Sequence, residues 1–299
     1  MVAVIRSENL SKRYGRRLGI DGVGIEVRGG EIFGYLGPNG AGKTTTIRLL
    51  MGFLRADRGR AEILGLDARR DGVAVRRRVG FLPGDVRLYD NLNGGEYLRF
   101  FAALRGGVDR PYVAELAERL SCPLAQPIRS LSQGNRRKIG LIQAFMHRPD
   151  LLILDEPTSG LDPIVRHEFF ELIAEARERG QTVFFSSHNL PEVERACDRV
   201  AIIRLGRIAA VERIEELKAR SLRNLEVRFA ADVAPGAFAA LPGLEIVAQE
   251  RRLLKGRMKG DMDALLKAVA RYPVADFRSQ EPDLEETFLA YYGDNGHAQ

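Results

Sequence analysis

One glycine-rich segment constrains the fold of this 299-residue chain more than any other feature. Residues 37–44 read Gly-Pro-Asn-Gly-Ala-Gly-Lys-Thr and match the pattern G-x-x-x-x-G-K-[ST], between β-rich residues 31–36 and helix-favouring residues 44–53. Glycines let backbone N–H groups curl around phosphate oxygens, and the helix dipole strengthens the attraction. The pattern therefore predicts a strand, a phosphate-binding loop (P-loop) and a helix. The residues expected to contact a nucleotide here are Gly37, Asn39, Gly40, Ala41, Gly42, Lys43, Thr44 and Thr45.

Two adjacent acids point to the rest of the same chemistry. Asp155 and Glu156 end an apolar strand, where neighbouring carboxylates are costly to bury unless a cation or water uses them. We expect Thr44 and Asp155 to hold Mg²⁺, Lys43 to neutralise the β- and γ-phosphates, and Glu156 to act as general base toward water. The alternative is a solvated strand end that carries two acids.

The remaining candidate residues are weaker signals when each is taken alone. Ser132 and Gly134 lie at the start of a predicted helix, where they could bind a phosphate or merely cap the helix. His188 follows predicted strand 182–187 and could contact a γ-phosphate at the carboxyl end of that strand, although a lone loop histidine is usually solvated. On the same general ground, we expect the side chain of His147 to be solvated.

The order of predicted elements divides the chain into two domains. Over residues 1–220, β-rich runs alternate with helical segments, which favours an α/β P-loop fold with a mixed, mainly parallel sheet. Strands are predicted at residues 31–36, 151–155, 182–187 and 199–205, and helices at 44–53 and 163–179. The apolar spacing over residues 93–146 is helical, so a helical subdomain is predicted at about residues 85–148.

The pattern of predicted strands and helices changes after residue 220, and so does the balance of basic and acidic residues. There are 36 basic and 28 acidic residues up to this point but 10 basic and 12 acidic residues beyond it. Residues 221–299 are predicted to form a small α+β accessory domain with the ferredoxin-like order β-α-β-β-α-β, followed by a last helix at 284–292. The predicted elements are strand 225–229, helix 236–241, strands 244–249 and 251–258, helix 262–272 and strand 274–278.

Composition narrows the possible partners and location. A content of 45% hydrophobic and 29% charged residues is typical of a globular protein, and the longest apolar runs fall far short of the roughly 20 residues that span a bilayer. The N-terminus has no apolar stretch of the kind that a secretory signal needs, so we expect a cytoplasmic protein. The 39 Arg and 7 Lys are dispersed among 40 acids, which indicates a solvated surface and no direct binding of nucleic acid.

Taken together, the motifs over roughly residues 2–218 resemble the ATP-binding subunit of ATP-binding cassette (ABC) transporters. The resemblance rests on Tyr14 ahead of the first strand, the P-loop, Leu-Ser-Gln-Gly-Asn at 131–135, Asp155-Glu156, Ser-Gly-Leu-Asp at 159–162 and Ser187-His188. It implies an ATPase whose cofactors are ATP and Mg²⁺. It also implies a head-to-tail homodimer in which Ser132 and Gly134 complete the ATP site of the other subunit. Tyr14 would stack on adenine, Asp162 would contact the opposing subunit, and His188 would hold the γ-phosphate.

Two positions depart from the pattern of that family. Gly84 stands where glutamine is usual, so no side chain at this position can reach Mg²⁺ or water. Asp85 either substitutes for the glutamine or is a turn residue. Gln133 and Asn135 replace the commonest glycine and glutamine, while Ser132 and Gly134 are kept.

The chain as a whole resembles the ATPase subunits of single-cassette bacterial exporters of drugs and antibiotics. That resemblance implies a separately encoded membrane permease, gripped near residues 84–91, and a peripheral location on the inner face of the cell membrane. Alternatives are an importer ATPase or a soluble cassette ATPase that acts on ribosomes or nucleic acid. The accessory domain is either a dimer-stabilising module or a regulatory sensor, and the transported substrate is not encoded in these motifs.

Overall fold

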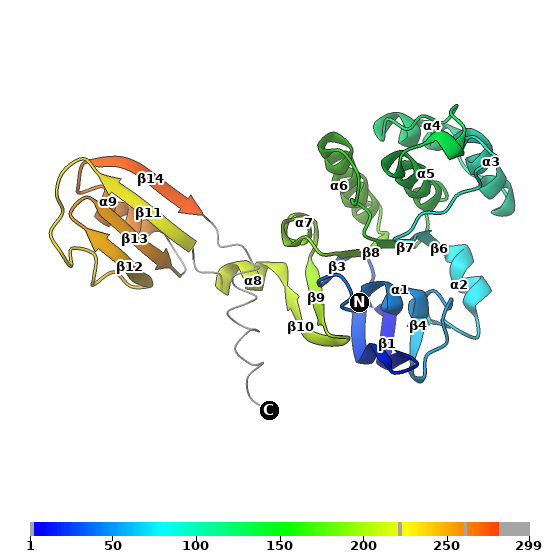
Figure 1. Cartoon of the computed structure of the whole chain (residues 1–299), viewed down its shortest axis with the longest axis horizontal. Coiled ribbons are helices and arrows are strands. Elements are labelled where there is room, and N and C mark those ends of the chain that lie inside the picture. Colours follow the sequence, from blue (N-terminus) through cyan, green and yellow to red (C-terminus); the bar gives the residue numbers. More distant parts are fainter. Residues whose placement is uncertain (1–2, 221–222, 260–261, 281–299) are drawn as a thin grey trace. The chain divides into compact units, whose positions relative to one another are not determined.

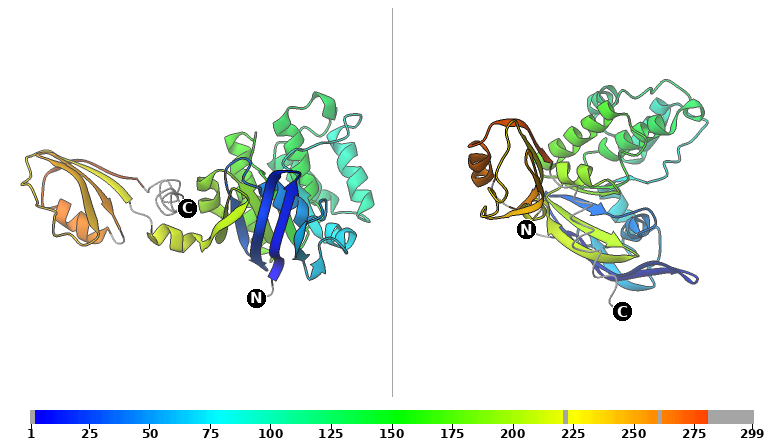
Figure 2. Two further views of the ribbon diagram at one scale, coloured as in Figure 1. Left: turned by 60° about the horizontal axis from the view of Figure 1, so that its bottom comes forward. Right: turned by 60° about the vertical axis from the view of Figure 1, so that its left-hand side comes forward.

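The computed structural model describes residues 3–220, 223–259 and 262–280. The chain forms two compact units, Met1–Glu212 and Arg213–Gln299, and the division lies eight residues before the predicted one at 220/221. Figures 1 and 2 show the elements of each unit. Among the described residues, no helix is both long and apolar enough to cross a membrane.

The first unit begins with an antiparallel sheet that the sequence analysis did not predict. Its strands are β1 (Ala3–Tyr14), β2 (Arg17–Arg28), β4 (Arg58–Ile63) and β5 (Leu66–Asp67), in the order β2-β1-β4-β5. Val23, Ile25 and Val27 of β2 are buried at every second position, which is the spacing of a strand with one face on the core. The expected mainly parallel sheet is therefore accompanied by a separate antiparallel one.

The second sheet of this unit carries the predicted parallel strands. The predicted strands are β3 (Ile32–Leu36), β7 (Leu151–Asp155), β8 (Thr182–Ser187) and β9 (Arg199–Arg204). Strands β6 (Val79–Leu82) and β10 (Arg207–Arg213) belong to the same sheet, whose order is β10-β9-β3-β8-β7-β6. The pairs β9-β3, β3-β8, β8-β7 and β7-β6 are parallel. Every residue of β3, β7 and β8 is buried, as continuous apolar runs predict for central parallel strands. The carboxyl ends of these three strands therefore meet at one edge of the sheet.

The helices of the first unit fall into two groups: some alternate with the strands, and others form the predicted helical subdomain. Helices α1 (Lys43–Leu50), α2 (Gly72–Arg78), α6 (Pro163–Glu178) and α7 (Leu190–Ala196) alternate with the strands along the chain. The subdomain consists of α3 (Gly94–Leu104), α4 (Arg110–Arg119), the 3₁₀ turn η1 (Ile128–Ser130) and α5 (Gln133–Phe145), which lie together away from the antiparallel sheet (Figures 1 and 2). A capping box between Asn93 and Glu96 explains why α3 begins where it does.

The second unit begins with α8 (Ile214–Arg220) and contains a four-stranded antiparallel sheet. Strands β11 (Arg223–Phe229), β12 (Leu244–Glu250), β13 (Leu253–Met258) and β14 (Val274–Gln280) have the order β12-β13-β11-β14, and α9 (Asp263–Val269) precedes β14. The helix predicted at 236–241 is wrong, because these residues form turns. Pro235-Gly236 and Pro242-Gly243 bracket too few residues for a regular helix.

The turn segment still supplies the core of the second unit. Phe238 is 1% exposed and stacks on Phe229, with a ring-centroid separation of 5.7 Å. The ring of Phe238, which belongs to a turn, thus packs at the place where a helix was expected. Of the two helices in the predicted ferredoxin-like order, only α9 is present among the described residues, and the helix predicted at 284–292 lies outside them.

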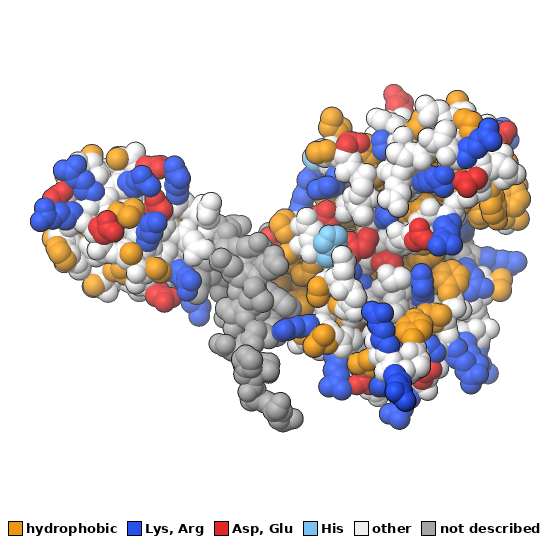
Figure 3. All heavy atoms as spheres, in the orientation of Figure 1, with side chains coloured by type: hydrophobic (Ala, Val, Ile, Leu, Met, Phe, Trp, Pro, Cys, Tyr) orange, Lys and Arg blue, Asp and Glu red, His pale blue; other side chains and the backbone are white. Residues whose placement is uncertain are grey.

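Charge is mixed over the surface of the first unit. Figure 3 shows basic and acidic side chains interspersed on the face in view.

Candidate nucleotide-binding site

The P-loop connects the end of β3 to the start of α1, as predicted. Gly42 is the N-cap residue of α1 with φ of 112°, and no side chain in the described part of the chain caps this helix. A Cβ atom on Gly42 would lie 2.6 Å from Cγ2 of Ile20, and one on Gly37 would lie 2.4 Å from the carbonyl oxygen of Ile203. Only glycine fits at these two positions, and the first N–H groups of α1 are left for a ligand.

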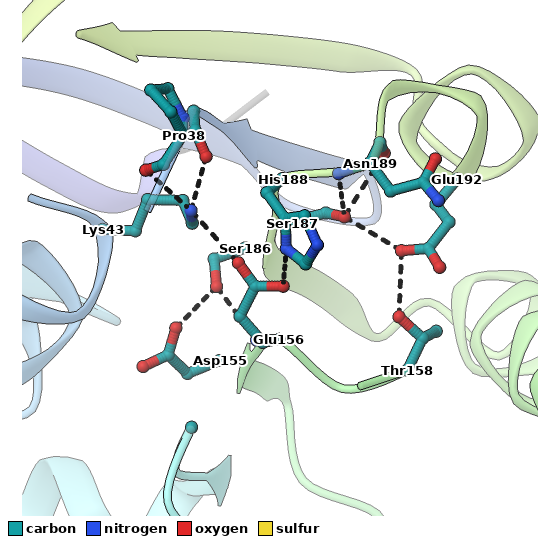
Figure 4. A network of polar contacts seen from close by, with 12 residues as sticks. Pro38, Lys43, Asp155, Glu156, Thr158, Ser186, Ser187, His188, Asn189 and Glu192 are labelled. Carbon is teal, nitrogen blue, oxygen red and sulfur yellow. Dashed lines mark hydrogen bonds and ion pairs between the residues drawn. The ribbon is translucent and has the colours of Figure 1, made fainter. Parts of the chain in front are cut away.

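Lys43 lies at the centre of the loop. Its side chain is 6% exposed, and its ammonium group donates to the carbonyl oxygens of Gly37 and Pro38. The same nitrogen forms an ion pair with Oε1 of Glu156 at 3.1 Å, and this oxygen has no hydrogen-bond partner among the described residues (Figure 4). The loop thus holds a buried cation that is paired with the Glu156 carboxylate.

Thr44 and Asp155 are brought together from residues 111 positions apart. Thr44 Oγ1 donates to Asp155 Oδ2 at 2.8 Å, and the hydroxyl of Ser186 donates to Asp155 Oδ1 at 2.6 Å. Asp155 is 1% exposed, so both of its oxygens are held in place. A hydroxyl and a carboxylate at this distance are the hard oxygen donors that Mg²⁺ prefers, and the pair fits that ion.

Glu156 and His188 form the second predicted pair. Nδ1 of His188 lies 2.8 Å from Oε2 of Glu156, at the carboxyl ends of β8 and β7, and the histidine side chain is 53% exposed (Figure 4). The backbone N–H of Glu156 donates to the hydroxyl of Ser186 at 3.0 Å. The carboxylate therefore lies between the Lys43 ammonium and an exposed imidazole, where it could accept a proton from water.

A cavity of about 380 Å³ opens beside these groups. Glu156 borders it together with Tyr14, whose hydroxyl lies 3.4 Å from Oγ1 of Thr45. Tyr14 does not precede the first strand as expected, because it is the last residue of the unpredicted strand β1. The lining residues are Tyr14, Arg17, Leu18, Gly19, Pro38, Asn39, Gly40, Gly42, Lys43, Thr44, Thr45, Arg48 and Glu156.

A buried carboxylate braces the loop that carries His188. Glu192 is 8% exposed and accepts from the hydroxyls of Thr158 and Ser187, each at 2.9 Å (Figure 4). The Ser187 hydroxyl in turn accepts from the backbone N–H of Asn189 at 2.9 Å. This network ties the segment after Glu156 to the loop on either side of His188.

Ser132, Gly134 and Asp162 are not among the residues that line the cavity. Ser132 caps α5 by accepting from the backbone N–H of Asn135 at 3.3 Å, and Asp162 caps α6 by accepting from that of Val165 at 3.0 Å. The hydrogen bond from Val165 lowers the pKa of the Asp162 carboxyl, and the Lys138 ammonium contributes to the same shift. Within one chain, Ser132 and Asp162 are helix caps, and Gly134 lies in the first turn of α5.

The segment after β6 departs from the family pattern in a specific way. A Cβ atom on Gly84 would lie 2.9 Å from Oδ2 of Asp155, so this position is crowded by the carboxylate itself. Asp85 is exposed and pairs with Arg87 at 2.8 Å. The geometry fits Asp85 as a turn residue.

Several residues around the site were missed by the sequence analysis. Ser186 contacts both Asp155 and Glu156, and its signal was the polar pair Ser186-Ser187 at the end of an apolar strand. Arg48 lies four residues after Thr44 on α1, a spacing that puts both on one helix face. Arg17 has no comparable local signal, because the turn between β1 and β2 brings it to the cavity.

Known proteins are similar in sequence to most of this chain. The ABC transporter family model matches residues 20–159. The linearmycin resistance ATP-binding protein LnrL of Bacillus subtilis (strain 168) is 31% identical over 307 residues, which cover 97% of this chain and 98% of that protein. The daunorubicin resistance ATP-binding protein DrrA3 of Streptomyces coeruleorubidus is 34% identical over 97% of this chain and 96% of its own length. The bacitracin transport ATP-binding protein BcrA of Bacillus licheniformis is 38% identical over 76% of this chain and 75% of its own.

Solved structures share the fold of the first unit. An ATP-binding subunit of an ABC transporter superposes with a TM-score of 0.66 at 29% identity, covering 72% of this chain and 92% of that one. A dimeric post-hydrolysis state of an ATP-binding cassette bound to ADP and Pi has the same fold, with a TM-score of 0.65 at 19% identity over 70% of this chain and 98% of its own. Since relatives of this similarity match nearly end to end, this chain belongs to the ATP-binding proteins of the ABC transporter family.

Proposed function

We propose that this ABC ATPase works as a homodimer that binds two ATP molecules at its interface and drives a separately encoded permease that exports drug-like or antibiotic molecules. The observation that carries the proposal is that Lys43 and His188 both contact the carboxylate of Glu156, which lines the P-loop cavity together with Lys43. Hydrolysis of a terminal phosphate needs positive charge near the phosphates and a group that positions the attacking water. Lys43 can supply the charge, and Glu156 with His188 can position the water.

Each group has a role that follows from its position. The free N–H groups of α1 and the Lys43 ammonium bind the phosphates, and Tyr14 stacks on the adenine. Glu156 accepts a proton from the attacking water, while His188 orients that water and contacts the γ-phosphate. Thr44 and Asp155 would hold Mg²⁺, which neutralises charge on the phosphates when it is bound.

The dimer is proposed because part of the expected phosphate-binding set lies away from the cavity. Ser132 and Gly134 are at the N-terminus of α5, and Asp162 is at that of α6. A second copy placed head to tail would bring these residues to the phosphates bound by Lys43 of the first. The Ser132 hydroxyl can accept from the Asn135 N–H while it donates its own proton to a phosphate oxygen.

An exposed aromatic cluster supports the permease as the partner. The ring of Tyr89 lies 6.0 Å from that of Phe100 and 6.2 Å from that of Phe101, and Leu104 on the same helix is 67% exposed. Large apolar side chains gathered on a surface favour docking of another protein. This cluster begins within the 84–91 segment, which was expected to grip the permease. Such docking would place the subunit on the inner face of the membrane.

The export direction and substrate class are proposed from the relatives. Two relatives that match nearly end to end are named for resistance to linearmycin and daunorubicin, and a third is named for bacitracin transport. Resistance is the expected outcome of moving such a compound outward.

Isolation of the tagged native chain from gently solubilised cells tests this proposal. Mass identification of a multi-span membrane protein in equal amount would support it and would name the permease. Ribosomes, nucleic acid or no partner would leave the ATPase assignment intact but overturn the transport role.

A further inference from the structure

Position 84 offers the site a backbone carbonyl and no side chain. The crowding by Asp155 explains the glycine, because a Cβ atom there would lie 3.2 Å from the carboxylate carbon of Asp155. The segment that begins at Gly84 therefore communicates with the site through its backbone.

Arg137 of α5 makes that backbone contact. Its Nη2 atom donates to the carbonyl oxygen of Gly84 at 2.7 Å, and its Nη1 atom donates to the carbonyl oxygen of Glu156. The planar guanidinium thus joins two peptide groups that lie 53 and 19 residues away along the chain. Asp155, Glu156 and Asp85 supply negative charge around it.

The peptide that Arg137 holds is a strained one. Glu156 has φ of 50°, in the left-handed region that residues other than glycine seldom adopt. Its N–H donates to Ser186 at 3.0 Å, and its carbonyl oxygen accepts from Arg137 and from the N–H of Ser159 at 3.2 Å. Removing Arg137 releases one side of this clamp, and the Glu156 carboxylate can then turn away from Lys43 and His188.

We propose that Arg137 is a positioning residue, which fixes the Glu156 carboxylate for hydrolysis and makes its orientation depend on where α5 and the Gly84 segment lie. The proposal rests on the proposed role of Glu156 as general base. Because Arg137 is five residues after Ser132 on α5, a shift of that helix on dimer closure would be transmitted to Glu156 through two hydrogen bonds.

Arg137→Ala, Arg137→Lys and the control Arg105→Ala test the inference at pH 7.5. Arg105 is a matched control because it is also partly buried and donates to two backbone carbonyls, those of Arg77 at 3.0 Å and Val79 at 3.4 Å, away from Glu156. We expect Arg137→Ala to lower kcat for ATP by about 10- to 100-fold, the effect of a misplaced catalytic group, with KM within about threefold. Lysine keeps the positive charge but has a single nitrogen in place of the planar two-pronged guanidinium, so Arg137→Lys should recover part of the rate.

The result that overturns the inference is a kcat for Arg137→Ala no lower than that of Arg105→Ala, or a loss of kcat that only follows a loss of melting temperature. If Arg137→Ala does not fold, the kcat and KM of Arg137→Lys decide by the same criteria.

A second comparison separates this inference from the proposed function. In single-turnover hydrolysis, Arg137→Ala added to Glu156→Gln should have little further effect, since it acts through Glu156. A full additional loss would overturn the inference and leave the role of Glu156 in place. A Glu156→Gln variant as active as the unaltered chain would instead overturn the general base itself.

Discussion

Two helix N-termini of the first unit differ in a way that explains how the site is divided. At α1 the N-cap is Gly42 in a left-handed conformation, and the described residues provide no capping side chain. At α5 the N-cap is Ser132, whose hydroxyl accepts from the N–H of Asn135. The first N–H groups of α1 are therefore available to a ligand, whereas at α5 the Ser132 hydroxyl already accepts from a first-turn N–H. The difference supports the proposal that α1 provides the primary phosphate site and that α5 contributes when a second copy brings a phosphate to it.

The largest effect is expected at the first terminus. Lys43→Ala should reduce ATP binding at least about 100-fold and abolish turnover, because phosphate charge would be uncompensated in a nearly buried position. Fluorescent nucleotide titration and phosphate release measure the two effects. Lys267→Ala, which removes an exposed lysine paired with Asp263 in the second unit, is the control and should change neither. Near-normal turnover by Lys43→Ala would remove the P-loop assignment.

Glu156→Gln should separate binding from chemistry. Without the carboxylate base, hydrolysis should fall by about 100-fold or more, while ATP still binds. A nucleotide-bound dimer should accumulate with ATP and Mg²⁺ and be visible by light scattering, with Glu115→Gln as a control that does not accumulate it. A Glu156→Gln chain that stays monomeric at saturating nucleotide would contradict the contribution of α5 to a shared site.

Ser132→Ala tests the capped terminus directly. Loss of the cap should lower stability by about 1 kcal/mol, as measured by denaturant unfolding of the isolated chain. If Ser132 also binds the partner's nucleotide, the same change in the Glu156→Gln background should weaken the ATP-dependent dimer. Ser130→Ala, at the end of η1, provides the comparison, and equal dimerisation in both variants would reduce Ser132 to a cap.

His147, which follows the C-terminal end of α5, should make the free energy of unfolding depend on pH. His147 was expected to be solvated, but burial and then the charge of Arg105 lower its pKa to about 4. Since the unfolded side chain has a pKa near ~6.5, the unfolded chain binds a proton that the folded chain does not between these values. Stability should therefore fall as pH falls from about 6.5 to 4.

Urea unfolding across that range measures the contribution of His147. The fall should be smaller in His147→Gln and unchanged in His167→Gln, where the side chain is 61% exposed. An unaltered slope in His147→Gln would show that other groups cause the dependence.

Asp85→Asn should have the smallest effect. The carboxylate is exposed and pairs with exposed Arg87, so ATP turnover should stay within about twofold. A loss of turnover or of its stimulation by the permease would make Asp85 the substitute for the missing glutamine.

Much of the first unit could be predicted because its signals are local. Residues 151–155 and 182–187 are strands with the predicted bounds, and the P-loop lies between its expected strand and helix. Continuous apolar runs mark central parallel strands, and glycine spacing marks a phosphate-binding loop. The helix predicted at 236–241 is wrong because Pro235-Gly236 and Pro242-Gly243 leave too few residues between them for a regular helix.

The sequence by itself determined which residues are chemically suited to bind phosphate and where the central strands begin and end. The tertiary structure decided which of these groups meet. The contact of Thr44 with Asp155 joins residues 111 positions apart, and Arg137 reaches two carbonyls that any residue type could provide. Periodicity and motifs report on neighbours within a few residues, whereas these contacts depend on the order of strands in a sheet and on a backbone acceptor that leaves no trace in the side-chain pattern.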